Sequence, residues 1–183
     1  MAKIVIIGDG PAGLSAALFL SKNQNEVTVL ADDKTPMHYA MLYNYLGIPE
    51  IAGSEFQQLA RAQVAGFGSV ILDTPATKIV REGSGFVVTA DDGSDHSADY
   101  VVIAEGKGGD LAASLGLVRT DRGIAADADG RTEIARLYVV GRATRPARSQ
   151  AIIAAGHGAA AALDIMAEEA GTDVRDYDSV GKG

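Results

Sequence analysis

The spacing of apolar residues over the first thirty positions predicts a unit of parallel sheet. Residues 3–8, KIVIIG, form a continuous β-branched run that ends at a glycine, which is typical of a strand buried on both faces. Residues 11–23 carry apolar side chains at helical spacing, and residues 26–30, EVTVL, form a second strand. A strand, a helix and a strand within about thirty residues indicate a right-handed crossover and therefore a parallel sheet.

The remaining pattern predicts two longer helices, several strands and one long loop. Positions 34–53 lose periodicity and are rich in Tyr, Met, Gly and Pro, which is typical of a functional loop. Helices are expected at 54–65 and 151–169, with one helical turn near 111–115. Further strands are expected at 69–72, 78–81, 85–89, 99–104, 123–125 and 136–141. The strands at 85–89 and 99–104, joined through the turn at 91–93, are expected to form a hairpin.

Length and composition are those of a globular protein of ordinary size. The 183 residues include 47% hydrophobic and 22% charged positions, and no apolar run approaches the roughly 20 residues of a membrane span. We therefore expect a single domain over residues 1–183, with about 172–183 as a surface tail, and no membrane partner. Residues 1–3 lack the length and charge of a targeting segment, so we expect a cytoplasmic protein.

Charge and cysteine content exclude several function classes. Sixteen Lys and Arg against 24 Asp and Glu give a net charge of −8, which argues against binding to nucleic acid because like charges repel. The chain has no cysteine, which excludes disulfides, thiolate metal sites and a redox dithiol of its own. His38, His96 and His157 lack partners at metal-ligand spacing, so we predict no metal site.

A glycine motif joins the first strand to the first helix. Gly8-Asp9-Gly10-Pro11-Ala12-Gly13 follows the GxGxxG pattern, in which glycines let the backbone approach a pyrophosphate at the helix N-terminus. A tight turn without a ligand is the alternative. The same fingerprint needs an acid after the second strand to bind ribose hydroxyls. Asp32 is the better candidate and Asp33 the next, whereas the alternative is two solvated loop aspartates.

Four segments together resemble the thioredoxin reductase-like branch of the FAD-dependent pyridine nucleotide-disulfide oxidoreductases. In family order they are GDGPAGLSAA (8–17), NYLGIP with GSEF (44–49 and 53–56), VVIAEG (101–106) and QAIIAAGHGAAA (150–161). The resemblance implies a Rossmann-like, three-layer α/β domain that binds FAD or NAD(P). Its parallel sheet would carry helices and a small antiparallel β-meander.

The resemblance also implies a set of cofactor-binding residues. In the family, the loop matching Asn44 lies along the flavin, and the segment matching Gln150 and Ala151 contacts its pyrimidine end. A helix that begins at Ala151 would independently stabilise negative charge on the reduced ring. Ordinary loop and capping hydrogen bonds are the alternative for Asn44 and Gln150. The full candidate set is Gly8, Gly10, Pro11, Ala12, Gly13, Asp32, Asp33, Asn44, Ala76, Ala104, Glu105, Gly106, Gly141, Arg142, Gln150 and Ala151.

The sequence departs from the family pattern in three places. The family inserts a nicotinamide-binding domain with a Cys-x-x-Cys after the segment matching 104–106, and residues 107–118 are too few to hold one. Glu105 stands where the family has Thr in Ala-Thr-Gly, and Arg142 stands where it has Asp in Gly-Asp. Arg142 can only donate to a ribityl hydroxyl, whereas Asp accepts. As a hypothesis, Glu105 and Arg142 form a swapped ion pair, in which case replacing Arg142 with Asp would lower flavin retention.

Arg142, Arg145 and Arg148 recur at every third position of a loop expected beside the cofactor. They are suited to the FAD pyrophosphate, a nicotinamide nucleotide or an anionic substrate, and a solvated basic loop is the alternative.

These features support three functions. The first is a single-domain FAD-binding oxidoreductase that exchanges electrons with NAD(P)H or a protein electron donor. FAD would do the chemistry, and no side chain stands out as a catalytic acid, base or nucleophile. The second is a non-catalytic flavin or dinucleotide carrier or sensor. The third places NAD in the site instead of FAD. A homodimer is suggested by analogy with the family alone.

Overall fold

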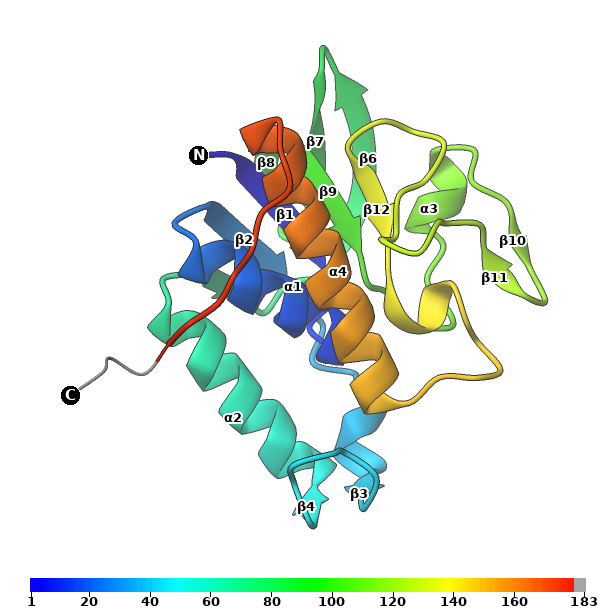
Figure 1. Ribbon diagram of the computed structural model, residues 1–183. Coiled ribbons are helices and arrows are strands. Elements are labelled where there is room, and N and C mark those ends of the chain that lie inside the picture. The colour runs from blue at the N-terminus through cyan, green and yellow to red at the C-terminus, as the bar shows by residue number, and fades with distance from the viewer. Residues whose placement is uncertain (180–183) are drawn as a thin grey trace.

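The computed structural model describes residues 1–179, and a five-stranded parallel sheet forms its centre (Figure 1). The strand order is β12-β9-β1-β2-β5, so the first strand of the chain lies in the middle. Every neighbouring pair is parallel. The strands are β1 (Lys3–Ile7), β2 (Glu26–Leu30), β5 (Val70–Leu72), β9 (Tyr100–Ile103) and β12 (Leu137–Val139).

The two faces of this sheet are covered by different layers. Helices α1 (Pro11–Lys22), α2 (Gly53–Gly66) and α4 (Ala151–Ala170) lie on one face. A three-stranded antiparallel sheet lies on the other, formed by β6 (Ala76–Glu82), β7 (Gly85–Ala90) and β8 (Asp95–Ala98). Alternate residues of β1 supply the two cores, Ile4 and Ile6 to one and Val5 and Ile7 to the other. The three-layer α/β fold expected from the sequence is confirmed.

The helices α1 and α4 pack closely because small residues face each other. A Cβ added at Gly158 of α4 would lie 2.0 Å from the carbonyl oxygen of Ala12 in α1, so only glycine permits this approach. The two backbones are in contact near the start of α1. The first turn of α1 is thereby fixed relative to α4 on the sheet.

Short helices and strands form the connections between the elements described above. The long segment 34–53 contains the 3-10 helix η1 and two antiparallel strands of two residues each, and further short elements follow β9. They are η1 (Pro36–Tyr39), β3 (Met41–Leu42), β4 (Ile51–Ala52), α3 (Leu111–Ser114), β10 (Arg119–Thr120), β11 (Gly123–Ile124) and the 3-10 helix η2 (Gly141–Ala143).

The predicted hairpin between residues 85–89 and 99–104 is wrong. Strand β7 pairs with β6 and β8, whereas β9 enters the parallel sheet between β1 and β12. The sequence DHSA of β8 has no apolar alternation, so periodicity did not reveal it. Asp99 redirects the chain, because its carboxylate accepts from the Lys3 N–H (2.8 Å) and its N–H donates to the Lys3 carbonyl (2.8 Å).

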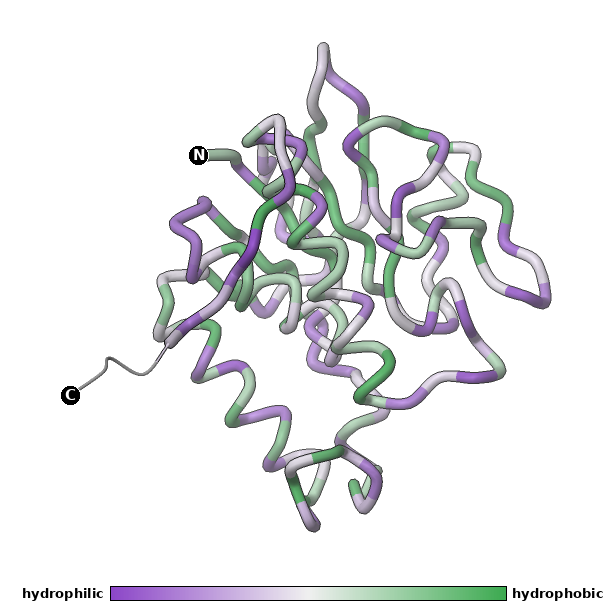
Figure 2. Tube along the Cα trace, viewed as in Figure 1, coloured by the Kyte–Doolittle hydropathy of each residue, from purple (hydrophilic) through white to green (hydrophobic). Residues whose placement is uncertain are grey.

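Helix α4 changes one expectation, because by length and composition it is apolar enough to cross a membrane. In the structure it packs along α1 and supplies Ala161, Ala162 and Ile165 to the core. Figure 2 shows hydrophobic segments concentrated in the central strands and the helices beside them. One face of α4 is therefore buried in the core of the helical layer.

The described part of the predicted tail lies on the surface. Lys22 at the end of α1 forms ion pairs with Asp176 (2.7 Å) and Asp178 (2.5 Å). Residues 180–183 of the predicted tail lie outside the described residues.

Candidate functional site

A cavity of about 740 Å³ opens at the carboxyl ends of β1, β2 and β9. This edge of a parallel sheet is where open α/β folds bind ligands, and the volume suits a small molecule. The cavity brings together twelve of the sixteen candidate residues: Gly8, Gly10, Pro11, Ala12, Asp32, Ala76, Ala104, Glu105, Gly106, Arg142, Gln150 and Ala151. Segments from almost the whole length of the chain therefore meet at one site.

The other four candidates do not line the cavity. Gly13 and Gly141 lie behind it, where an added Cβ would be 1.9 Å from the Gly8 oxygen and 2.7 Å from the Ala12 Cβ, respectively. Asn44 lies beside it, and its side-chain amide donates to Gln150 Oε1 (3.2 Å). The two glycines thus lie against lining residues, and Asn44 is hydrogen-bonded to one.

The two aspartates after β2 have different positions. Asp32 lines the cavity together with Lys34, and their side chains form an ion pair at 2.8 Å. Asp33 has a φ of +47° and a carboxylate 2.8 Å from His38 Nε2, outside the cavity lining. The structure thus places Asp32, the better candidate from the sequence, where it can contact a ligand.

The glycine motif forms a close backbone cradle. Gly8 has a φ of +98°, and a Cβ there would lie 2.6 Å from the Ala104 carbonyl oxygen, so no other residue fits. Gly10 is the N-cap of α1 and supplies no side-chain hydrogen bond to the first N–H groups of the helix. Those N–H groups and the helix dipole are suited to an anionic ligand such as a pyrophosphate.

A buried carboxylate inside the motif is neutralised by α2. Asp9 is 3% exposed, and its side chain forms an ion pair with Arg61, which also pairs with Asp73. The Gln57 amide donates to the Asp9 carbonyl (2.5 Å) and carboxylate (3.2 Å). Because Arg61 balances its charge, Asp9 does not leave an isolated negative charge beside the cradle. Sequence reasoning missed Gln57 and Arg61, because they lie about fifty residues away and belong to no local motif.

The predicted ion pair between Glu105 and Arg142 is wrong. Glu105 Oε1 instead accepts from the Leu111 N–H (3.2 Å) at the start of α3, and Oε2 is buried without a hydrogen-bond partner among the described residues. The reason is the short connection after β9, which folds back over the carboxyl group. A Cβ at Gly109 would lie 2.2 Å from the Glu105 Cβ. Burial raises the pKa of Glu105 above its ordinary value, and the amides at the start of α3 offset part of this effect.

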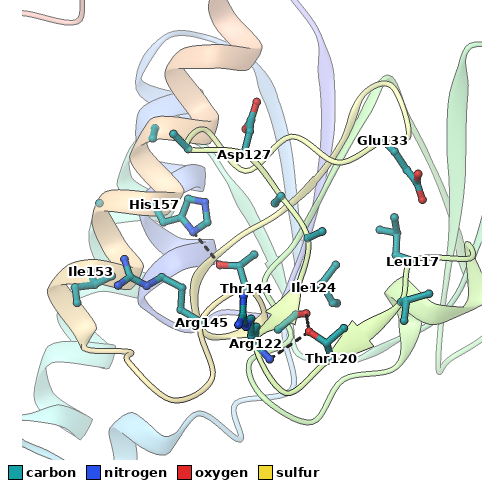
Figure 3. A pocket seen from close by; sticks show the side chains of 17 residues that line it. Leu117, Thr120, Arg122, Ile124, Asp127, Glu133, Thr144, Arg145, Ile153 and His157 are labelled. Atoms are coloured by element: carbon teal, nitrogen blue, oxygen red, sulfur yellow. Dashed lines mark hydrogen bonds between the residues drawn. The ribbon is translucent and has the colours of Figure 1, made fainter.

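The three arginines of the β12–α4 loop do not act as one group. Arg142 lines the cavity described above, whereas Arg145 lines a second cavity against α4 (Figure 3). Arg148 is exposed and lines neither of them. The regular spacing of arginines in the sequence therefore does not correspond to one basic surface.

Comparisons with known proteins show the family of the chain. The model of the family described as pyridine nucleotide-disulphide oxidoreductase matches residues 2–109. The chain is 34% identical over 111 residues to a thioredoxin reductase of Helicobacter pylori, covering 58% of this chain and 36% of that protein. It is 29% identical over 119 residues to a ferredoxin–NADP reductase of Thermus thermophilus, covering 57% and 34%. The matched segment spans about a third of the length of these curated relatives.

Solved structures show the same fold at low sequence identity. A thioredoxin reductase from Gloeobacter violaceus superposes with a TM-score of 0.86 at 15% identity, covering 98% of this chain and 99% of that chain. The atypical thioredoxin reductase TRi from Desulfovibrio vulgaris Hildenborough gives 0.83 at 18% identity, covering 91% and 97%.

Proposed function

Because the chain belongs to the pyridine nucleotide-disulphide oxidoreductase family, we propose that it binds FAD at the carboxyl ends of β1, β2 and β9 and acts as an oxidoreductase. The glycine cradle carries this proposal. Gly8 and Gly10 line the cavity, an added Cβ at Gly10 would meet only Thr35 Oγ1 at 3.6 Å, and the N-terminus of α1 supplies N–H donors for a pyrophosphate. As part of the same proposal, residues 1–183 form a single FAD-binding domain in the cytoplasm.

Individual residues have distinct parts in this binding. The ADP half would lie on Gly8, Gly10 and Pro11, with the Asp32 carboxylate accepting from ribose hydroxyls. The flavin ring would be positioned by Gln150, which is hydrogen-bonded to Asn44, and by the N-terminus of α4 at Ala151. When bound, FAD supplies hydride and electron transfer, and the protein supplies position and charge.

We propose that the electron donor and acceptor are external to residues 1–183. The sequence has no cysteine, and between β9 and β10 there is only α3 with its short connections, where no second nucleotide-binding domain fits. NAD(P)H or a protein electron donor would therefore reach the flavin directly. The relatives are named thioredoxin reductases and ferredoxin–NADP reductases, and either kind of partner is compatible with this proposal. A homodimer stays a prediction.

A carrier or sensor without turnover is the second candidate function. The buried Glu105 oxygen, which has no hydrogen-bond partner within residues 1–179, and the cation at Arg142 favour it, because both alter charge in the cofactor cavity. Mass spectrometry of the extracted ligand separates FAD from NAD. Bleaching of a flavin absorption spectrum by NADH or NADPH separates an oxidoreductase from a carrier.

Replacing Gly10 with alanine tests the site itself. A Cβ at Gly10 would approach only Thr35 Oγ1, at 3.6 Å, so folding is expected to be unchanged. The methyl group would occupy the approach of the pyrophosphate, and the affinity for FAD is expected to fall at least tenfold, about 1.4 kcal/mol. Flavin fluorescence titration and thermal unfolding measure the two quantities. Unchanged FAD affinity in Gly10→Ala would place the cofactor elsewhere.

Replacing Glu105 with glutamine tests the charge in the cavity. The raised pKa means that the folded protein holds this proton more tightly than the unfolded chain, so the carboxyl favours folding below the ordinary pKa of 4.5 and loses that contribution as pH rises. Glu105→Gln is therefore expected to gain stability relative to the parent between pH 4 and 7, and to bind FAD roughly tenfold more tightly at pH 7. The exposed Glu82→Gln is the control. A stability difference independent of pH would contradict the burial of this carboxyl.

A further inference from the structure

A second cavity of about 830 Å³ lies against α4 and the β10–β11 hairpin (Figure 3). Its floor is apolar, since Leu117 and Ile124 line it and are 5% and 3% exposed, and Ile153 of α4 forms part of its wall. The volume is in the range of small-molecule sites. The proposed cofactor site does not use this cavity, although Ile153 and His157 of the segment 150–161 line it.

The second cavity shares a wall with the cofactor cavity. Arg142, Gln150 and Ala151 of the segment 141–157 line the cofactor cavity, whereas Arg145 and His157 of the same segment line the second one. The wall is bonded internally, because His157 Nδ1 accepts from the Gly141 N–H (3.1 Å). A molecule in the second cavity would therefore contact His157, which is hydrogen-bonded to Gly141 beside Arg142 of the cofactor cavity.

Two exposed arginines stand at the edge of this cavity. Arg122 and Arg145 line it and form no ion pair within residues 1–179. Burial and the charge of Arg145 lower the pKa of His157, while Asp127 and Asp129 oppose that shift. The ring is therefore neutral at pH 7, and because Nδ1 is the acceptor, Nε2 carries the proton and is a donor.

The charges in the cavity are separated by position. Figure 3 shows Arg122 and Arg145 at one end of the cavity, and Asp127 and Glu133 toward the other. One Asp127 oxygen already accepts from the backbone N–H groups of Asp129 (3.0 Å) and Arg131 (2.8 Å). An anionic group is thus favoured only at the arginine end.

We propose that the second cavity binds a small organic anion, a carboxylate or a phosphate monoester on an apolar body. The anionic group lies at Arg122 and Arg145, where guanidinium donors match its oxygens. The apolar body covers Leu117 and Ile124. The site is separate from the FAD site and does not depend on flavin being bound.

The test uses the full chain labelled with nitrogen-15 and follows the amide signals of Ile124 and Gly141 by NMR. Benzoate and phenyl phosphate are the probes, and benzyl alcohol is the neutral analogue. Saturable shifts with either anion, and binding at least tenfold weaker for benzyl alcohol, are expected. Arg145→Gln is expected to weaken anion binding about tenfold, the effect of one charge-assisted hydrogen bond.

Arg148→Gln is the matched control, because it removes the same charge from the same loop outside the cavity. Its affinity for both anions is expected to equal that of the parent. Equal losses in Arg145→Gln and Arg148→Gln would overturn the proposal, since loop charge alone would then account for binding. An affinity for benzyl alcohol equal to that for the two anions would also overturn the proposal. Inorganic phosphate alone giving the same amide shifts as phenyl phosphate would overturn it too, because the cavity would then bind an adventitious ion only. Arg122→Gln repeats the test if Arg145→Gln does not fold.

Discussion

Replacement of Gly13 with alanine is expected to lower the free energy of unfolding by about 3 kcal/mol. The added Cβ would lie 1.9 Å from the Gly8 carbonyl oxygen and 3.3 Å from Ile6 Cγ2. Gly8 is held in place, because its N–H donates to the Leu30 carbonyl (2.9 Å) and it lies so close to Ala104 that an added Cβ would be 2.6 Å from the Ala104 oxygen. The helix α1 must therefore shift away from the sheet. Urea unfolding followed by circular dichroism measures the loss.

A second glycine provides the control for this prediction. Gly156 is also helical, and a Cβ there would meet nothing within 4 Å. Gly156→Ala is expected to leave stability unchanged or to raise it by about 0.5–1 kcal/mol through helix propensity. The close packing of α1 on the glycine motif would be contradicted if Gly13→Ala and Gly156→Ala had the same urea midpoint.

Replacement of Arg61 with methionine is expected to cost about 3 kcal/mol of stability. Methionine keeps most of the side-chain length but removes both ion pairs of the guanidinium, with Asp9 and Asp73. The Asp9 side chain is 4% exposed, so its charge would be left buried with only the Gln57 amide beside it. Affinity for FAD should fall as well, because an unbalanced carboxylate would lie within the phosphate cradle. Thermal unfolding and flavin titration measure the two effects.

A double variant identifies charge as the cause. Asp9→Asn combined with Arg61→Met removes the carboxylate together with its partner, and most of the stability lost in the single variant should return. If the double variant is as unstable as Arg61→Met, lost packing of the arginine side chain, and not charge, would be responsible. The exposed Arg81→Met is a suitable control, because Arg81 contacts the Phe86 ring but no buried carboxylate.

Several elements could be predicted because their signals are local. The glycine motif lies directly between the apolar run at 3–8 and the helical spacing at 11–23. These three neighbouring signals together predict the turn from β1 to α1. Strand β8 was missed because its polar sequence has no period, and its place depends on pairing with β7. The predicted hairpin was wrong for a related reason, because the pairing partners of β9 are β1 and β12, which are distant in the sequence.

The sequence by itself determined the strand-turn-helix unit, the class of fold and the edge of the sheet at which the glycine motif lies. Backbone geometry and apolar periodicity act over a few residues, so they can be read in order along the chain. Only the tertiary structure decided that Arg61 balances Asp9, that Glu105 bonds to α3 instead of Arg142, and that Arg145 faces a separate cavity. Those pairings depend on which side chains meet after folding, and charge partners separated by fifty residues leave no periodic trace in a sequence.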